Sequence, residues 1–133
     1  MGIAAGLIGL AALLPDLGSS LPRPEIASGG YAVARAPDGQ YYANGKAGGA
    51  SVRFLIDPGS DRVLIAGADA ARMGLEVGPG FTPIILPRLA IGPHERRQVP
   101  AVVAPDLPVS LLGRSFLSRL ESAGVENGRM VLR

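Results

Sequence analysis

Cysteine and tryptophan are absent from this chain of 133 residues, and His94 is its only histidine. The lack of cysteine excludes disulfide frameworks, thiolate metal sites, iron–sulfur clusters and cysteine nucleophiles. A zinc site built on one histidine would need three carboxylates, and the sequence shows no such cluster. We therefore expect no metal ion and no other cofactor. We interpret His94, which lies among charged residues, as a solvated loop residue.

Charged side chains are also scarce, at 18% of the chain, and the formal net charge is only +2. The thirteen basic residues are scattered, whereas binding to a phosphate backbone needs a concentrated basic face. A nucleic-acid partner is therefore not expected. The 47% apolar content excludes a disordered chain, and the length supports one domain. In that setting, 19 glycines and 12 prolines indicate short strands joined by tight turns.

The first thirty residues form a separate region of the sequence. Residues 1–14 carry no charge and are too few for a standard transmembrane helix. They match the apolar core of an export signal in length but lack the basic residues that should precede it. A buried helix is the third interpretation. We favour an export signal or membrane anchor, because residues 15–30 form a linker rich in proline, glycine and serine. The expected location is the bacterial periplasm or inner membrane, with the folded domain at residues 31–133.

That folded part predicts a mostly β domain. Short apolar runs bounded by turn residues indicate strands at residues 31–35, 40–43, 51–56, 62–65, 99–104, 109–112, 124–125 and 130–132. Turns are expected at Asn44-Gly45, at residues 92–97 and at Asn127-Gly128, with a bulge at Gly48-Gly49. Helical spacing is confined to an internal segment, residues 67–75, and a C-terminal segment, residues 114–120.

Asp57 is the residue whose position suggests chemistry. It stands at the end of the apolar run 51–56 and two residues before Gly59. A buried carboxylate is costly unless it has hydrogen-bond donors, a charged partner or a retained proton. An ordinary turn explains the same residues, because Asp-Pro-Gly is common turn chemistry and Asp57 can bond the amide of Gly59. This segment alone leaves both interpretations open.

The order of several motifs favours a catalytic role. Phe54-Leu-Ile-Asp57-Pro-Gly-Ser60 is followed by Asp69-Ala-Ala-Arg-Met-Gly-Leu75 and then by Leu111-Leu112-Gly113-Arg114. This series, spread over residues 41–133, resembles the bacterial retropepsin-like (retroviral-type) aspartic proteases. In that family a strand ending in Asp-Thr-Gly-Ala/Ser precedes an Asp-Ala-x-x-Leu-Gly-Leu helix and an apolar-apolar-Gly strand. The resemblance implies a small closed β-barrel of the retropepsin type, with one internal and one C-terminal helix.

The same resemblance implies an aspartic endopeptidase that acts on peptide or protein substrates as a homodimer, with one catalytic Asp57 from each protomer. Two adjacent carboxylates share one proton, so that one activates a water molecule while the other polarises the peptide carbonyl. Substrate-binding roles are implied for Gly59, Ser60 and Asp61. Support of the active-site loop is implied for Pro58, Gly113 and Arg114, with Arg114 paired to Asp61. Residues 130–132 are implied to belong to the dimer interface.

Two features depart from the family pattern. Pro58 replaces the threonine whose hydroxyl and amide lock the two active-site loops together, and proline has neither group. Losing these hydrogen bonds, at about 1 kcal/mol each, predicts a weak dimer or a monomer. Residues 76–88 are also few for the flap, the β-hairpin that covers substrate, and Pro83 and Pro87 should interfere with its strand pairing. We therefore expect a stunted flap.

Two functions from different classes follow. The first, which we favour, is the dimeric aspartic endopeptidase, either periplasmic or tethered to the membrane through residues 1–14. The second is a catalytically degenerate member of the fold that serves as a binding or assembly module. Both departures affect function and leave the core intact, so the sequence does not decide between the two.

Overall fold

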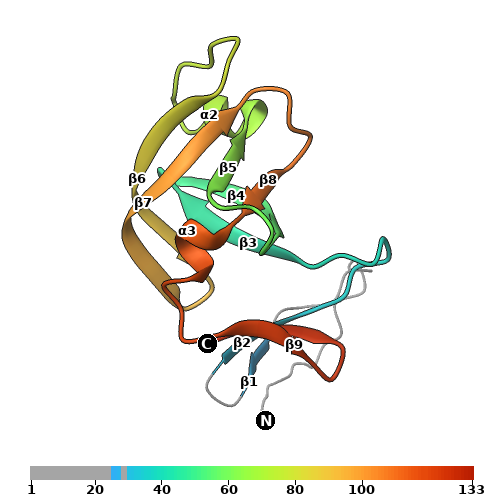
Figure 1. Cartoon of the computed structure of the whole chain (residues 1–133). Helices are drawn as coiled ribbons and strands as arrows, with labels where there is room; N and C mark the ends of the chain where they lie inside the picture. The colour runs from blue at the N-terminus through green and yellow to red at the C-terminus, as the bar shows by residue number, and fades with distance from the viewer. Residues whose placement is uncertain (1–24, 28–29) are drawn as a thin grey trace, which may run out of the picture.

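The computed structural model describes residues 25–27 and 30–133, so the predicted export or anchor segment at residues 1–14 lies outside it. The described residues form ten strands and two short helices (Figure 1). None of the helices described is long and apolar enough to cross a membrane. The elements are β1 (Glu25–Ala27), β2 (Gly30–Ala34), β3 (Tyr42–Ala47), β4 (Ala50–Ile56), β5 (Val63–Ala66), α2 (Gly67–Arg72), β6 (Thr82–Ile91), β7 (His94–Ala104), β8 (Ser110–Leu112), α3 (Arg114–Leu117), β9 (Ala123–Glu126) and β10 (Arg129–Leu132).

Six strands close into a barrel in the order β3-β4-β8-β5-β7-β6. Strand β8 runs parallel to β4 on one side and antiparallel to β5 on the other. Strand β8 therefore lies between β4 and β5, which are consecutive in the chain. The loop that joins β4 to β5 must pass the end of β8. The prediction of a mostly β, closed barrel with one internal and one C-terminal helix is confirmed.

The other four strands form a second sheet, β1-β2-β10-β9, at the lower end of Figure 1. Strand β1 comes from the segment assigned to the linker, and it pairs with β2. His94 joins this sheet to the barrel, because its Nε2 lies 2.9 Å from the carbonyl oxygen of Leu132. The prediction of a solvated loop residue is thus wrong for His94, which is half-buried at the start of β7. The turn predicted at residues 92–97 is shorter than expected. It occupies only Gly92 and Pro93, since β7 begins at His94 and includes the charged residues that follow.

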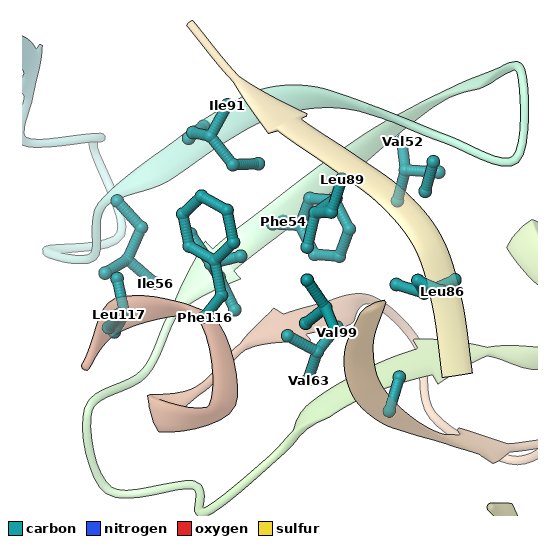
Figure 2. Close-up of a cluster of buried hydrophobic side chains, with 14 of the residues drawn as sticks. Val52, Phe54, Ile56, Val63, Leu86, Leu89, Ile91, Val99, Phe116 and Leu117 are labelled. Atoms are coloured by element: carbon teal, nitrogen blue, oxygen red, sulfur yellow. The ribbon is translucent and has the colours of Figure 1, made fainter. Parts of the chain in front are cut away.

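The core fills the barrel with aliphatic side chains around two phenylalanines. Phe54 of β4 and Phe116 of α3 are both fully buried. Figure 2 shows Phe116 pointing from α3 into the barrel, beside Ile91, Phe54 and Val63. Aromatic side chains bury more apolar surface than any others, so Phe116 anchors α3 firmly against the barrel. This anchor holds the start of α3, where Gly113 and Arg114 lie next to the candidate site.

The β3–β4 turn lies elsewhere than predicted. Strand β3 continues through Asn44-Gly45, and the chain reverses at Gly48-Gly49, which have φ angles of 55° and 78°. Positive φ at both central residues is what a tight two-residue hairpin turn requires, and glycine meets it without strain. Gly45 serves close packing instead, because a Cβ there would lie 2.5 Å from Cδ1 of Ile91. The second predicted turn, Asn127-Gly128, is confirmed between β9 and β10.

Candidate active site

Asp57 directly follows β4, on the loop that leads to β5. The backbone N–H of Asp57 donates to the carbonyl of Leu112 at 3.1 Å, which extends the β4–β8 pairing into the loop. Farther along, the N–H of Arg114 donates to the carbonyl of Ser60 at 2.8 Å. Both ends of the loop are therefore tied to the end of β8. The position of the Asp57 carboxylate depends on this contact as well as on its own turn.

Gly113 makes that contact possible. A Cβ at Gly113 would lie 2.2 Å from the carbonyl oxygen of Arg62 and 2.7 Å from that of Ser60. Real Cβ atoms do not approach backbone oxygens so closely, and no flexible side chain can move aside here. The loop thus packs directly on the backbone of Gly113, which explains why the apolar-apolar-Gly sequence is needed at the end of β8.

Asp57 is half-buried as a residue, and one of its carboxylate oxygens already accepts a hydrogen bond. Oδ1 accepts a hydrogen bond of 3.0 Å from the N–H of Gly59, and the carbonyl of Asp57 accepts one of 3.1 Å from Ser60. An ordinary turn makes the same bonds, so they do not by themselves assign catalysis. Within the part of the chain that the structure describes, Oδ2 has no hydrogen-bond partner. One carboxylate oxygen is therefore available for a water molecule or a second carboxylate.

The ion pair implied between Asp61 and Arg114 is present. Both side chains are more than half exposed, so the pair adds little stability, and its effect is to hold the outer side of the loop against α3. The hydrogen-bonding groups of Ser60 are also in use. Its N–H donates to the carbonyl of Asp57, its carbonyl accepts from the N–H of Arg114, and its hydroxyl donates to the carbonyl of Arg62 at 2.7 Å. Among the backbone groups of the loop, the carbonyl of Gly59 and the N–H and carbonyl of Asp61 are therefore the freer ones, since the N–H of Gly59 bonds Asp57.

A buried serine at the start of β8, which was not predicted from the sequence, ties this strand to its neighbours. The opposite end of β8 holds the Asp57 loop. Ser110 is fully buried; its hydroxyl accepts from the N–H of Ala66 at 2.9 Å and donates to Oδ2 of Asp69 at 2.6 Å. Asp69 in turn pairs with Arg72 on α2. Three elements, β5, α2 and β8, are thus joined through one hydroxyl. The only signal in the sequence is a serine within an otherwise apolar run.

We expect Ser110→Ala to lower the free energy of unfolding by about 1–3 kcal/mol, because it leaves the buried N–H of Ala66 without a partner. Chemical denaturation measures this loss. Ser118→Ala is the matched control, since the Ser118 hydroxyl is exposed and bonds only within its own helical turn. Equal stability of the two variants would contradict the supporting role of Ser110.

Comparison with known proteins places this arrangement in a family. The model of the family described as "gag-polyprotein putative aspartyl protease" matches residues 43–119, more than half of the chain. The chain belongs to the retropepsin-like aspartic protease family. The matched range contains both the Asp57 loop and the Gly113 contact that holds it.

Solved structures agree with this assignment. A retropepsin-like aspartic protease from Rickettsia conorii is 26% identical, with a TM-score of 0.72 over 83% of this chain and 93% of that one. The protease of EIAV, solved with the inhibitor HBY-793, is 20% identical, with a TM-score of 0.54 over 71% of this chain and 100% of that one, and it supports the fold alone.

Two curated relatives are uncharacterized proteins. One, from Rickettsia prowazekii, is 25% identical and matches 92% of this chain and 57% of its own length. The other, encoded in the cobV 5' region of a Sinorhizobium species, is 29% identical and matches 72% of this chain and 48% of its own length. The chain thus spans about half the length of the curated relatives it matches.

This retropepsin-like chain has no flap hairpin in the residues described. Residues 75–81 follow the turn that ends α2, contain no strand and lead straight into β6. Strand β6 pairs with β7 from Thr82 to Ile91, so Pro83 lies in a paired strand of the barrel and the ladder is interrupted only at Pro87. On its other side β6 meets β3 only at Leu89–Ile91. Pro83 and Pro87 therefore lie on an open edge, where a missing N–H costs little.

The dimer interface implied at residues 130–132 also needs correction. Strand β10 is flanked by β2 on one side and β9 on the other, and its residues 130–132 are buried within the chain itself. Strand β10 has no open edge for a partner chain, because β2 and β9 of the same chain occupy its two sides. The outer edge of β9, where Val125 is 55% exposed, is open in the described residues.

Proposed function

We propose that this retropepsin-like chain is one half of an aspartic endopeptidase, which hydrolyses peptide bonds with a water molecule activated by two Asp57 carboxylates, one from each protomer. The observation that supports this most is the Asp57 loop. It is held at both ends by β8, it packs on Gly113 without an intervening side chain, and it leaves one carboxylate oxygen unbonded. Such an arrangement presents a carboxylate in a defined position.

The chemistry requires the second carboxylate because one group cannot act as acid and base together. Two carboxylates held close share one proton, since like charges cannot both ionise at that distance. The ionised Asp57 takes a proton from water, and the oxygen attacks the peptide carbonyl while the protonated Asp57 polarises it. The tetrahedral species then releases the amine, which receives a proton, and leaves a carboxylic acid. The chain itself contributes one Asp57, so a twofold dimer supplies the pair.

We place the contact between protomers at the β9 edge of the second sheet. An unpaired strand edge with an exposed apolar side chain favours pairing with another strand, and antiparallel pairing of β9 with β9 would satisfy a twofold axis. The absence of a flap in the described residues means that this dimer would hold substrate in an open cleft. Substrates would then be bound mainly through the loop carrying Gly59 and Asp61.

Two observations favour the second function, a catalytically degenerate binding or assembly module. Pro58 is exposed and has no N–H or hydroxyl to offer across a dimer axis. Residues 75–81 form no hairpin that could cover a substrate. Both features remove parts that the reaction uses and leave the barrel complete.

The first function predicts cleavage of an unfolded protein substrate at acidic pH that is inhibited by pepstatin. Asp57→Asn is expected to lower this activity by at least about 10³-fold, because the amide can neither accept the proton from water nor share one. Appearance of peptide fragments, followed by mass spectrometry, measures the rate. Asp106→Asn is the matched control, since Asp106 is an exposed carboxylate outside the loop.

The two functions give opposite results in this experiment. Cleavage that persists in Asp57→Asn, or a wild-type chain that neither cleaves nor dimerises, would contradict the endopeptidase. Pepstatin-sensitive cleavage that disappears in Asp57→Asn alone excludes the degenerate module.

A further inference from the structure

A groove crosses the outside of the barrel, away from the catalytic loop. It has a volume of about 830 Å³, and its floor is the outward face of the β3–β4 hairpin. Residues of α2 and of the segment before β8 form one wall, and the β6–β7 turn lies at the other end. Asp57 is not among the residues that line it. We call this hollow the outer groove.

The outer groove carries an excess of positive charge. Lys46, Arg53 and Arg72 line it, and among the described residues Asp69 is the only carboxylate that does. Asp69 is already neutralised, because one of its oxygens pairs with Arg72 and the other accepts from the buried Ser110. Lys46 bonds the hydroxyl of Ser51, and within the part of the chain that the structure describes it has no ion pair. The groove thus holds basic groups that a ligand with carboxylates would satisfy.

Arg53 is held in position by an aromatic ring. Its guanidinium carbon lies 4.1 Å from the centroid of the Tyr42 ring, a cation–π contact that orients the group. The hydroxyl of Tyr42 donates to Asp38, which fixes the ring and raises the pKa of Tyr42. Asp38 lies outside the groove lining, and its carboxylate offsets part of the Arg53 charge from that side. A preoriented guanidinium binds a carboxylate at a smaller entropic cost than a free side chain does.

The shape fits an extended chain. Tyr42, Asn44 and Lys46 alternate along β3 with buried residues, so all three face the groove. At a strand rise of about 3.3 Å per residue, they cover about 13 Å, the length of about four extended residues. Asn44 is the cross-strand partner of Arg53 and stands two residues before Lys46 on β3, where it offers an amide to a peptide backbone.

We propose that the outer groove is a docking site for an extended acidic peptide segment of a partner protein. The carboxylates of that segment pair with Lys46 and Arg53, and its backbone bonds Asn44. A nucleic acid fits less well, because Arg53 occupies one face of Tyr42, the aromatic side chain in the groove lining on which a base would stack. Docking here does not depend on catalysis by Asp57, so it applies to either function considered above.

The test is a binding titration of the full chain with a fluorescein-labelled peptide of alternating glutamate and alanine, followed by fluorescence anisotropy. Saturable binding is expected, and the matched glutamine–alanine peptide is expected to bind more weakly. The double change Lys46→Gln and Arg53→Gln is expected to weaken binding of the acidic peptide about five- to tenfold, from two partly exposed charge contacts. Arg97→Gln, an exposed charge on β7 outside the groove, is expected to bind like wild type.

Two further variants separate position from charge. Asn44→Trp keeps every charge but fills the floor of the groove, and it is expected to abolish binding. Asp57→Asn is expected to bind like wild type, which distinguishes this site from the catalytic loop. Equal affinity for the acidic and glutamine peptides, an equal loss in Arg97→Gln, undiminished binding to Asn44→Trp, or a single-stranded oligothymidine that binds more tightly than the peptide would each overturn the proposal.

Discussion

Replacing Gly113 with alanine is expected to lower the free energy of unfolding by about 3–5 kcal/mol, a large part of the stability of a domain of this size. The added Cβ would lie 2.2 Å from the carbonyl oxygen of Arg62 and 2.7 Å from that of Ser60. Both contacts are with backbone, so relief requires the whole loop to move away from β8. Such a movement breaks the hydrogen bond from Arg114 to Ser60 and displaces Asp57.

Urea denaturation followed by circular dichroism measures this effect. Gly124→Ala is the matched control, because a Cβ on Gly124 meets no atom within 4 Å and its φ angle is ordinary. The control is expected to stay within about 0.5 kcal/mol of wild type. A shift in Gly113→Ala no larger than in the control would show that the loop does not pack on Gly113 as described. Any catalytic activity is expected to fall in the same variant by more than its unfolded fraction explains, since Asp57 moves with the loop.

Replacing Pro58 with threonine is expected to tighten the proposed dimer about 10²–10³-fold. Threonine restores an N–H and a hydroxyl at the position where the family builds its lock between loops. Two hydrogen bonds from each protomer, at about 1 kcal/mol each, give an effect of this size. Pro58 is exposed, so the change leaves the core intact. Loss of the proline makes the unfolded chain more flexible, which lowers the free energy of unfolding by up to about 1 kcal/mol.

Sedimentation equilibrium measures the dissociation constant, and Pro58→Ala is the informative control. Alanine restores the N–H alone, so its dimer is expected to lie between wild type and the threonine variant. If the wild-type chain cleaves slowly and Pro58→Thr cleaves faster at equal dimer occupancy, the loops meet in the dimer as the family resemblance implies. An unchanged dissociation constant in both variants would mean that Pro58 does not face a partner loop.

The candidate site was largely predictable from short stretches of sequence. An apolar run ending in Asp57-Pro58-Gly59, and a second run ending in Gly113, specify where two strands end and where a side chain is excluded. The ion pair between Asp61 and Arg114 followed from the family resemblance, and it is present. The turn at Asp57-Pro58-Gly59 is local, whereas the Gly113 contact and the ion pair join segments more than fifty residues apart and were predictable only through the family resemblance.

The positions of turns and edges were less predictable. Asn44-Gly45 is a strong local turn signal, yet β3 passes through it. Pairing of Gly45 with both Val52 and Ile91 outweighs the local preference, and the turn moves to Gly48-Gly49. Pro87 is tolerated in β6 for a related reason, since the strand has an unpaired edge at that point. Neither outcome can be derived before the neighbouring strands are known.

Composition and motif order alone determined that this chain forms one small β domain of the retropepsin type, with a single candidate catalytic aspartate and no thiol chemistry. Tertiary structure decided that residues 130–132 are enclosed within their own chain, that β9 lies at an open edge of the second sheet, and that residues 75–81 form no flap. It also assembled Lys46, Arg53 and Arg72, which are scattered in sequence, in one groove. The physical reason is the range of the interactions: neighbouring residues decide where a strand ends, whereas open edges, enclosed strands, gathered charges and the close packing on Gly113 exist only after distant strands have paired.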